Sequence, residues 1–201
     1  RTGAHCAVMS RRSEPALVRV LAECALDAEL PESLRSSALS RLASLDSPAA
    51  AEALLEIAGR APRQVQVAAL SALRRTRKHV PVESLRPLCE NPDPTIARLA
   101  IECAGAVSGL NAGEIVEWAL GSPHPAVRIG AYNALLSYDR PTYATKVWDA
   151  VRDPDGAVRA GFAESVPWGA PREACLALAS LLSDGIPNVR LSAVQALARL
   201  G

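Results

Sequence analysis

The sequence predicts an all-α protein in which helical hairpins stack into an α-solenoid. The first observation is a near-repeat, because SPHPAVRIGAYNALLS at 122–137 is followed by DPDGAVRAGFAESV at 153–166, which sets a 31-residue period. Apolar residues recur at helical spacing in both of these segments, and no segment of the sequence alternates apolar and polar residues as a strand does. Composition agrees, with 49% hydrophobic but only 3% aromatic residues. A core of alanine, leucine and valine favours closely packed helices.

The register of the repeat extends along the chain without insertions. The same step, taken in both directions from Val127, reaches an aliphatic residue in every unit, which we call the anchor of that unit. The residue four places later is alanine in every unit except one, where it is Phe162. A helical hairpin of this length cannot bury its apolar face alone, whereas stacked neighbours can. The six anchors are Leu34, Val65, Ile96, Val127, Val158 and Val189.

These steps define one array and its predicted elements. Residues 1–12 are expected to be the second helix of a truncated unit, and the chain is expected to be a fragment of a longer protein. In each later unit a first helix precedes the second by about a dozen residues, with a short turn between them. The six units are predicted at 13–45, 46–76, 77–107, 108–138, 139–169 and 170–201.

The turns carry recognisable helix-start signals. Pro94, Pro125 and Pro187 lie two residues before their anchors, where a first-turn proline loses no needed hydrogen bond. Asp93 and Asp155 lie three before, as N-caps. Unit five departs from the pattern, because Phe162 replaces the small residue and VPWGAPRE follows at 166–173. A local irregularity is therefore expected there.

Charge and cysteine content exclude some classes of protein. The net charge of +1 favours neither nucleic acid nor an anionic membrane as partner. No apolar run approaches the roughly 20 residues of a membrane helix. The cysteines form no CxxC pair, so we expect small buried side chains in a reducing, cytoplasmic protein. They are Cys6, Cys24, Cys89, Cys103 and Cys175.

The segments DPDGAVRAGFAESV and IPNVRLSAVQALARLG carry a family resemblance. They resemble HEAT repeats, most of all the short bacterial HEAT-like type first described in phycobilisome lyases, and the resemblance extends over essentially the whole chain. It implies an armadillo-like superhelix whose second helices line a concave surface. The motif is specific for fold and poorly specific for function.

The resemblance also implies a ladder between units, formed by an aspartate before the second helix and an arginine within it. Asp155 and Arg159 fit this pattern fully, and Asp184 lies slightly earlier in its unit. His124 replaces the aspartate before Arg128. Units two and three lack the arginine or the aspartate, so their rungs are expected to be incomplete. The arginines expected in the ladder are Arg35, Arg128, Arg159 and Arg190.

No constellation of residues indicates catalysis. His5, His79 and His124 fall in separate units without a ligand partner at helical spacing, and no phosphate-binding or nucleophile-elbow motif occurs. We therefore expect no catalytic residues, no metal and no cofactor. The basic run 74–78 ends a helix, where cations complement the helix dipole, although an acidic or phosphate partner is the alternative.

A polar stripe is the candidate binding surface. The position six residues after each anchor is polar in every unit and is predicted to face away from the apolar side. The alternative is plain solvation of an outward face. Trp118 and Trp148 are predicted to be core residues, and Trp168 an exposed anchor in a Pro/Gly loop. The predicted binding residues are Arg75, Arg98, Glu102, Asn133, Glu164 and Gln195.

Mixed charge on this stripe suits a protein or peptide better than a phosphate backbone, which requires a row of cations. The leading hypothesis is a non-catalytic scaffold or regulatory segment, with protein partners or other domains of the same chain, no nucleic acid and no membrane. One alternative is nucleic-acid binding, as in HEAT-like DNA glycosylases. Another, from family resemblance alone, is a bilin lyase-type protein.

Overall fold

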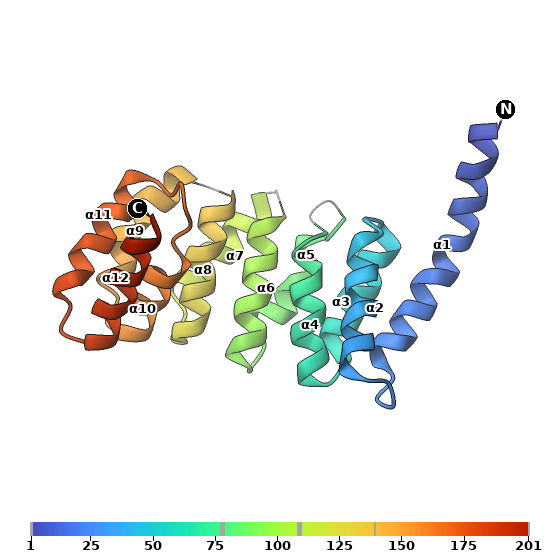
Figure 1. The fold of residues 1–201 in the computed structure, drawn as a ribbon, viewed down its shortest axis with the longest axis horizontal. Coiled ribbons are helices and arrows are strands. Elements are labelled where there is room, and N and C mark those ends of the chain that lie inside the picture. The colour runs from blue at the N-terminus through green and yellow to red at the C-terminus, as the bar shows by residue number, and fades with distance from the viewer. Residues whose placement is uncertain (1, 77–78, 108–109, 139, 201) are drawn as a thin grey trace. The chain divides into compact units, whose positions relative to one another are not determined.

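In the computed structural model, residues 2–76, 79–107, 110–138 and 140–200 are described, the side chains of 2–13, 110–112, 137–138 and 140 excepted. His5 and Cys6 of the sequence predictions, and Arg77 and Lys78 of the basic run, lie outside the described side chains. All regular elements of the described residues are helices (Figure 1). The chain divides into two compact units, 1–88 and 89–201.

Unit 1 is a stack of helical hairpins. Helices α1 and α2 pack together, α3 packs on α4, and α2 also packs on α4. The second helices α2 and α4 thus form one layer of the stack and α1 and α3 the other. The helices are α1 Thr2–Leu26, α2 Glu32–Ser44, α3 Pro48–Arg60, α4 Arg63–Leu73 and α5 Val82–Cys89, whose last residue lies past the unit boundary.

Unit 2 repeats this arrangement. The second helices α6, α8, α10 and α12 pack on one another in chain order, and the first helices pack against them. Each unit is therefore an α-solenoid of stacked hairpins. The elements are α6 Pro94–Ala106, α7 Leu110–Leu120, α8 Pro125–Tyr138, α9 Arg140–Ala150, α10 Gly156–Ser165, α11 Arg172–Ser180, the short 3-10 helix η1 Leu181–Ser183 and α12 Pro187–Leu200.

The period seen in the sequence sets where the second helices begin. All six start two residues before their anchor, from Glu32 before Leu34 to Pro187 before Val189. Asp93 and Asp155 are N-caps, since their side chains accept hydrogen bonds from the backbone N–H groups two residues on. The residues four places past the anchors, Phe162 included, are all buried.

Phe162 is accommodated by other aromatic side chains. Its ring centroid lies 6.5 Å from that of Tyr132 on α8 and 6.4 Å from that of Tyr143 on α9. Helix α10 then ends at Ser165, and Gly169 adopts a φ of +75°, which suits glycine. Aromatic packing and a loop thus replace the alanine contact of the other units.

Three sequence predictions need correction. The helix boundary expected at residue 12 does not occur, because α1 continues from Thr2 to Leu26 through Pro15. A proline removes one helical hydrogen bond, and the helix extends past that loss. The anchor Leu34 is exposed, whereas the other five anchors are buried. Trp118, predicted to be core, is half exposed on α7.

Candidate functional site

In unit 2, two arginines each tie the turn within one hairpin to the turn within the next. Arg128, in the first turn of α8, donates from Nη1 to the carbonyl oxygen of Ser122 in its own turn at 2.7 Å. Its Nε and Nη2 donate to the two carboxylate oxygens of Asp153 in the following turn, both at 2.7 Å. Such a bidentate pair fixes orientation as well as distance.

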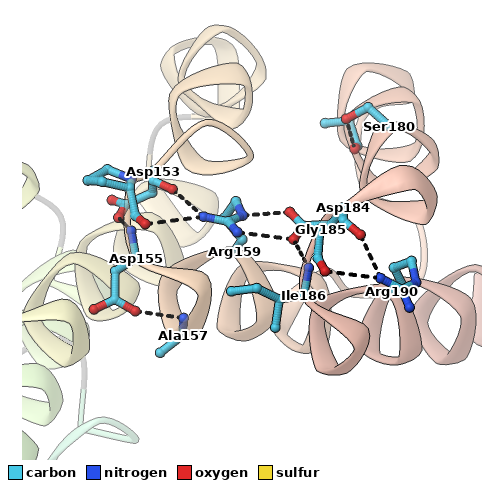
Figure 2. A network of polar contacts seen from close by, with 11 residues as sticks. Asp153, Asp155, Ala157, Arg159, Ser180, Asp184, Gly185, Ile186 and Arg190 are labelled. Carbon is cyan, nitrogen blue, oxygen red and sulfur yellow. Dashed lines mark hydrogen bonds and ion pairs between the residues drawn. The ribbon is translucent and has the colours of Figure 1, made fainter.

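Arg159 repeats this geometry one hairpin later (Figure 2). Its Nη1 donates to the carbonyl of Asp153 at 2.6 Å, while Nε and Nη2 donate to the Asp184 carboxylate at 2.6 and 3.0 Å. Arg190 in turn donates from Nη1 to the carbonyl of Asp184 at 2.8 Å. Asp153 and Asp184 therefore join two successive rungs each, through the carboxylate on one side and the carbonyl on the other.

The rungs shift the protonation equilibria of their members. The hydrogen bond from Arg159 lowers the pKa of the Asp184 carboxyl, helped by the backbone N–H of Ile186. The carboxylates raise the pKa of Arg128 and of Arg159 in return. These side chains are largely buried between hairpins, so the rungs hold neighbouring hairpins together and offer little surface to a ligand.

The ladder uses a different aspartate from the one predicted. Asp155 is not a rung residue, because its carboxylate accepts the backbone N–H of Ala157 as a helix cap. The rung carboxylate is Asp153, whose other contact is the N–H of Asp155. The sequence signal that identifies it is a 25-residue spacing between each rung arginine and its aspartate, as in Arg128 and Asp153.

The hairpin that contains α6 lacks both the rung arginine and the aspartate that would accept its hydrogen bonds. Ala97 stands at the arginine position of α6, and Ser122 stands where the spacing of the other rungs would place the aspartate. Arg35, predicted to be a ladder residue, forms no rung, since that spacing leads from it to Arg60 and not to an acidic residue. Its Nε is buried and has no hydrogen-bond partner among the described residues.

The polar stripe is partly buried in unit 2. Glu102, predicted to face solvent, is only 6% exposed. Arg98 on the same helix pairs with its carboxylate, and Asn133 on α8 donates to the same oxygen at 3.2 Å. The approach is close because Gly130 of α8 lies against the backbone of Arg98. The equivalent positions 102 and 133 therefore touch across one period.

In the next two hairpins the polar stripe is exposed to solvent. Glu164 on α10 is exposed and accepts a hydrogen bond from Ser192 on α12 at 3.0 Å. Arg199 donates to the backbone carbonyls of Glu164 and Val166 at 2.9 and 3.2 Å. Gln195 is exposed. The stripe in unit 2 thus runs from a buried ion pair to exposed carboxylate and amide groups.

In unit 1 the same stripe lines a shallow cavity. Arg75 donates to Ser40 at 3.2 Å across the two second helices. Both line a cavity of about 180 Å³ between α2 and α4, together with Ser71. The lining is neutral apart from the guanidinium, and it provides hydrogen bonds to a polar ligand group.

The tryptophans lie in different environments. Trp168 is 82% exposed in the loop after α10, as predicted for an anchor residue. Trp148, predicted to be core, is intermediate in exposure, with the Arg152 guanidinium 6.0 Å from its ring centroid. Trp118 is the residue for which burial was predicted wrongly. Its position among apolar neighbours in the sequence indicated core, but α7 presents it to solvent.

The described residues contain no grouping of three or more histidine, cysteine or acidic side chains able to hold a metal ion.

Burial raises the pKa of Tyr132 to about 12 and raises that of Tyr143 further, which keeps both phenols neutral. Both phenols are therefore protonated at neutral pH, and neither tyrosine belongs to the polar stripe. None of the described helices is long and apolar enough to cross a membrane.

Comparison with known proteins agrees with this architecture over part of the chain. The family model of HEAT repeats matches residues 82–167. No curated protein matches the chain. An engineered protein solved by a structural genomics consortium is 16% identical, with a TM-score of 0.48 over 91% of this chain and 98% of that one. A designed armadillo repeat protein in complex with peptide (KR)4 is 14% identical, with a TM-score of 0.43 over 93% and 99%.

Proposed function

We propose that this chain is a non-catalytic recognition module that binds a protein segment along the exposed part of the polar stripe, around Glu164 and Gln195. The observation that carries the proposal is the regular placement of hydrogen-bonding side chains on adjacent second helices, since Glu164 on α10 and Gln195 on α12 lie one period apart and are both exposed. Stacked repeats present such rows as extended surfaces. An extended peptide offers backbone N–H and C=O groups at regular spacing, which amide and carboxylate side chains can bind.

The charges on the stripe favour a peptide over a phosphate backbone. Arg98 is paired with Glu102, and Glu164 adds an exposed negative charge. Nucleic-acid binding requires several cations free to neutralise phosphates. On the described part of the stripe only Arg75 is an exposed cation, and it lies in the other unit. We place the module in a reducing, cytoplasmic setting, since Cys24 and Cys175 are not in disulfides.

The test is selection from a displayed peptide library against the full chain. Peptides enriched on the wild-type chain are expected to lose at least about tenfold in affinity with Gln195→Arg, which adds a bulky cation to the exposed stripe. Glu117→Arg, on an exposed position of the first helix α7, is the control and is expected to bind normally. Fluorescence anisotropy with labelled peptides provides the Kd values.

Two results would contradict the proposal. One is a library that yields no binding peptide, and the other is a set of peptides that bind the wild-type chain and the Gln195→Arg variant equally. A parallel titration with duplex DNA tests the alternative partner. Salt-sensitive DNA binding without any peptide binding would replace the proposed function by nucleic-acid recognition.

A further inference from the structure

A second, smaller cavity continues the cavity between α2 and α4 in unit 1. The two cavities share Ser36, Leu39 and Ala68 in their lining, so they form one groove along the two helices, which we call the α2–α4 groove. Arg35 lines the smaller cavity, of about 20 Å³, in the first turn of α2, and Arg75 lines the larger one. Because α2 and α4 pack on each other as consecutive second helices, the groove is formed entirely by these two hairpins.

Arg35 lacks the carboxylate partner that its equivalent in unit 2 has. It stands directly after the anchor Leu34, as Arg128 stands after Val127. In Arg128 the Nε and Nη2 atoms hold the carboxylate of Asp153. The Nε of Arg35 is buried without a hydrogen-bond partner among the described residues. A buried donor without an acceptor is unfavourable, so an anion at this end of the groove makes an interaction that the fold leaves unmade.

The other end of the groove provides a guanidinium and hydroxyl groups. Arg75 is exposed, and its Nη2 donates to the Oγ of Ser40 at 3.2 Å. Because that oxygen accepts from Arg75, the hydroxyl proton of Ser40 can donate to a ligand. Ser36 lies one turn earlier on the same face of α2. A guanidinium beside hydroxyl donors binds an anionic oxygen through charge-assisted hydrogen bonds.

The two ends of the groove are spaced like alternate residues of an extended peptide. Arg35 and Ser40, which contacts Arg75, are five residues apart on α2, a rise of about 7.5 Å. Residues i and i+2 of an extended chain point to the same side and lie about 6.5–7 Å apart. Two acidic side chains separated by one residue therefore match the two ends. Leu39 and Val65, both buried, form an apolar floor between them.

We propose that the α2–α4 groove binds an acidic peptide segment, with one carboxylate at Arg35 and a second, two residues along the peptide, at Arg75 and Ser40. Glu32 also lines the Arg35 end, so its carboxylate opposes an anion there. The groove still carries two cations against this one anion. The site lies in unit 1 and goes beyond the peptide binding proposed for the exposed stripe of unit 2, so it is tested separately.

Isothermal titration calorimetry of the full chain at low ionic strength tests this inference with two synthetic peptides. Both contain two glutamates among serines and threonines, so their net charges are equal. In the spaced peptide one residue separates the glutamates, and in the adjacent peptide none does. The chain is expected to bind the spaced peptide about tenfold more tightly, because adjacent side chains of an extended peptide point to opposite sides.

Variants of the groove assign the binding to its residues. Arg35→Gln and Arg75→Gln are each expected to weaken binding of the spaced peptide by about tenfold or more, because each removes a charged donor. Glu32→Gln is expected to strengthen it about two- to threefold, since a like charge is removed, and a folding defect cannot produce such a gain. Arg19→Gln makes the same charge change at an exposed position of α1, where Arg19 is paired with Glu23, and is expected to bind like the wild type.

A wild-type chain that does not bind the spaced peptide would overturn the inference. So would affinities that Arg35→Gln and Arg75→Gln leave unchanged while both keep the wild-type circular dichroism spectrum. Equal binding of the two peptides would contradict the assignment of one carboxylate to each arginine. Binding of inorganic phosphate that Arg75→Gln abolishes, without binding of either peptide, would assign the groove to a phosphate ligand instead. Gln195→Arg is expected to bind the spaced peptide normally, so failure at the stripe and failure at the groove are distinguishable.

Discussion

Asp184 shows how one carboxylate links stability to pH. Its pKa is lowered mainly by the hydrogen bond from Arg159, while an unfolded aspartate titrates near 3.9. A group whose pKa is lower in the folded state stabilises that state above the unfolded pKa, and this contribution is lost as pH falls through the folded value. The rung is therefore fully stabilising at neutral pH and weakens below about pH 4.

The corresponding variant is Asp184→Asn, which leaves Arg159 partly buried without its anion. At pH 7 we expect the free energy of unfolding to fall by about 1–3 kcal/mol, because a buried charge loses its partner. The deficit should shrink as pH falls from about 4 through the lowered pKa of the folded wild-type carboxyl, below which that group is protonated as well. Urea denaturation at a series of pH values measures both effects.

Asp155→Asn is the control for that series, because asparagine caps a helix about as well as aspartate. We expect its effect to stay within a few tenths of a kcal/mol at every pH. A deficit for Asp184→Asn that does not change with pH would mean that the lost stability comes from packing and not from the ion pair.

Sequence reasoning identified the rung arginines of unit 2 and named Asp184, but it chose Asp155 where the rung uses Asp153. Arg159 was found from its place after the anchor, but Asp155 was chosen because the N-cap signal is local and strong. The rung depends on a turn of the next hairpin, and only the 25-residue spacing of Arg128 and Asp153 reveals it. Glu102 was wrongly predicted to face solvent, because the angular position of a residue on its own helix takes no account of neighbouring helices. Helix α6 packs against both α7 and α8.

At the scale of elements, α6 and α8 make the closest approach in the second-helix layer of unit 2. A side chain at Gly105 would overlap the Cα and Cβ of Ala134, so the two backbones would have to separate. Gly59 is its counterpart near the end of α3, with no heavy atom within 4 Å of an added Cβ. The two glycines occupy the penultimate position of their helices, which makes them a matched pair.

We expect Gly105→Ala to lower the free energy of unfolding by about 1–3 kcal/mol, as overpacking against backbone does. Gly59→Ala should raise it by up to about 1 kcal/mol, because alanine favours a helix and meets no obstacle. Thermal and urea unfolding monitored by circular dichroism measure both. If both variants stabilise the chain equally, the close approach of α6 and α8 is not maintained in solution.

The start of each second helix was predictable because the anchor recurs every 31 residues, with proline two before it or aspartate three before it in units three to six. The helices of the first hairpin were harder to predict from the sequence. Ser13-Glu14-Pro15 looks like a helix start, yet α1 passes through it, since such signals permit a start without requiring one. Helix α5 is short, with Pro87 inside its eight residues, and no periodic pattern signals that length.

At the scale of the whole molecule, the sequence indicated one uniform array and the structure has two compact units. Repeat register describes where helices begin, but it does not describe how closely each hairpin packs on the next. The boundary falls at the end of α5, which is the shortest of the first helices. The two bidentate arginine rungs, Arg128–Asp153 and Arg159–Asp184, both lie in unit 2.

This arrangement predicts how damage to one rung spreads. In stacked repeats each hairpin contacts only its neighbours, so stability is a sum of local terms. Asp153→Asn removes the partner of Arg128 in the middle of unit 2. Amide hydrogen exchange is expected to accelerate by about tenfold or more in α8–α10, which meet at that rung, and to stay unchanged in α2–α4. The Asp155→Asn variant should leave both regions unchanged. Faster exchange throughout the chain would instead mean that both units unfold as one cooperative body, so that a rung in one governs opening in the other.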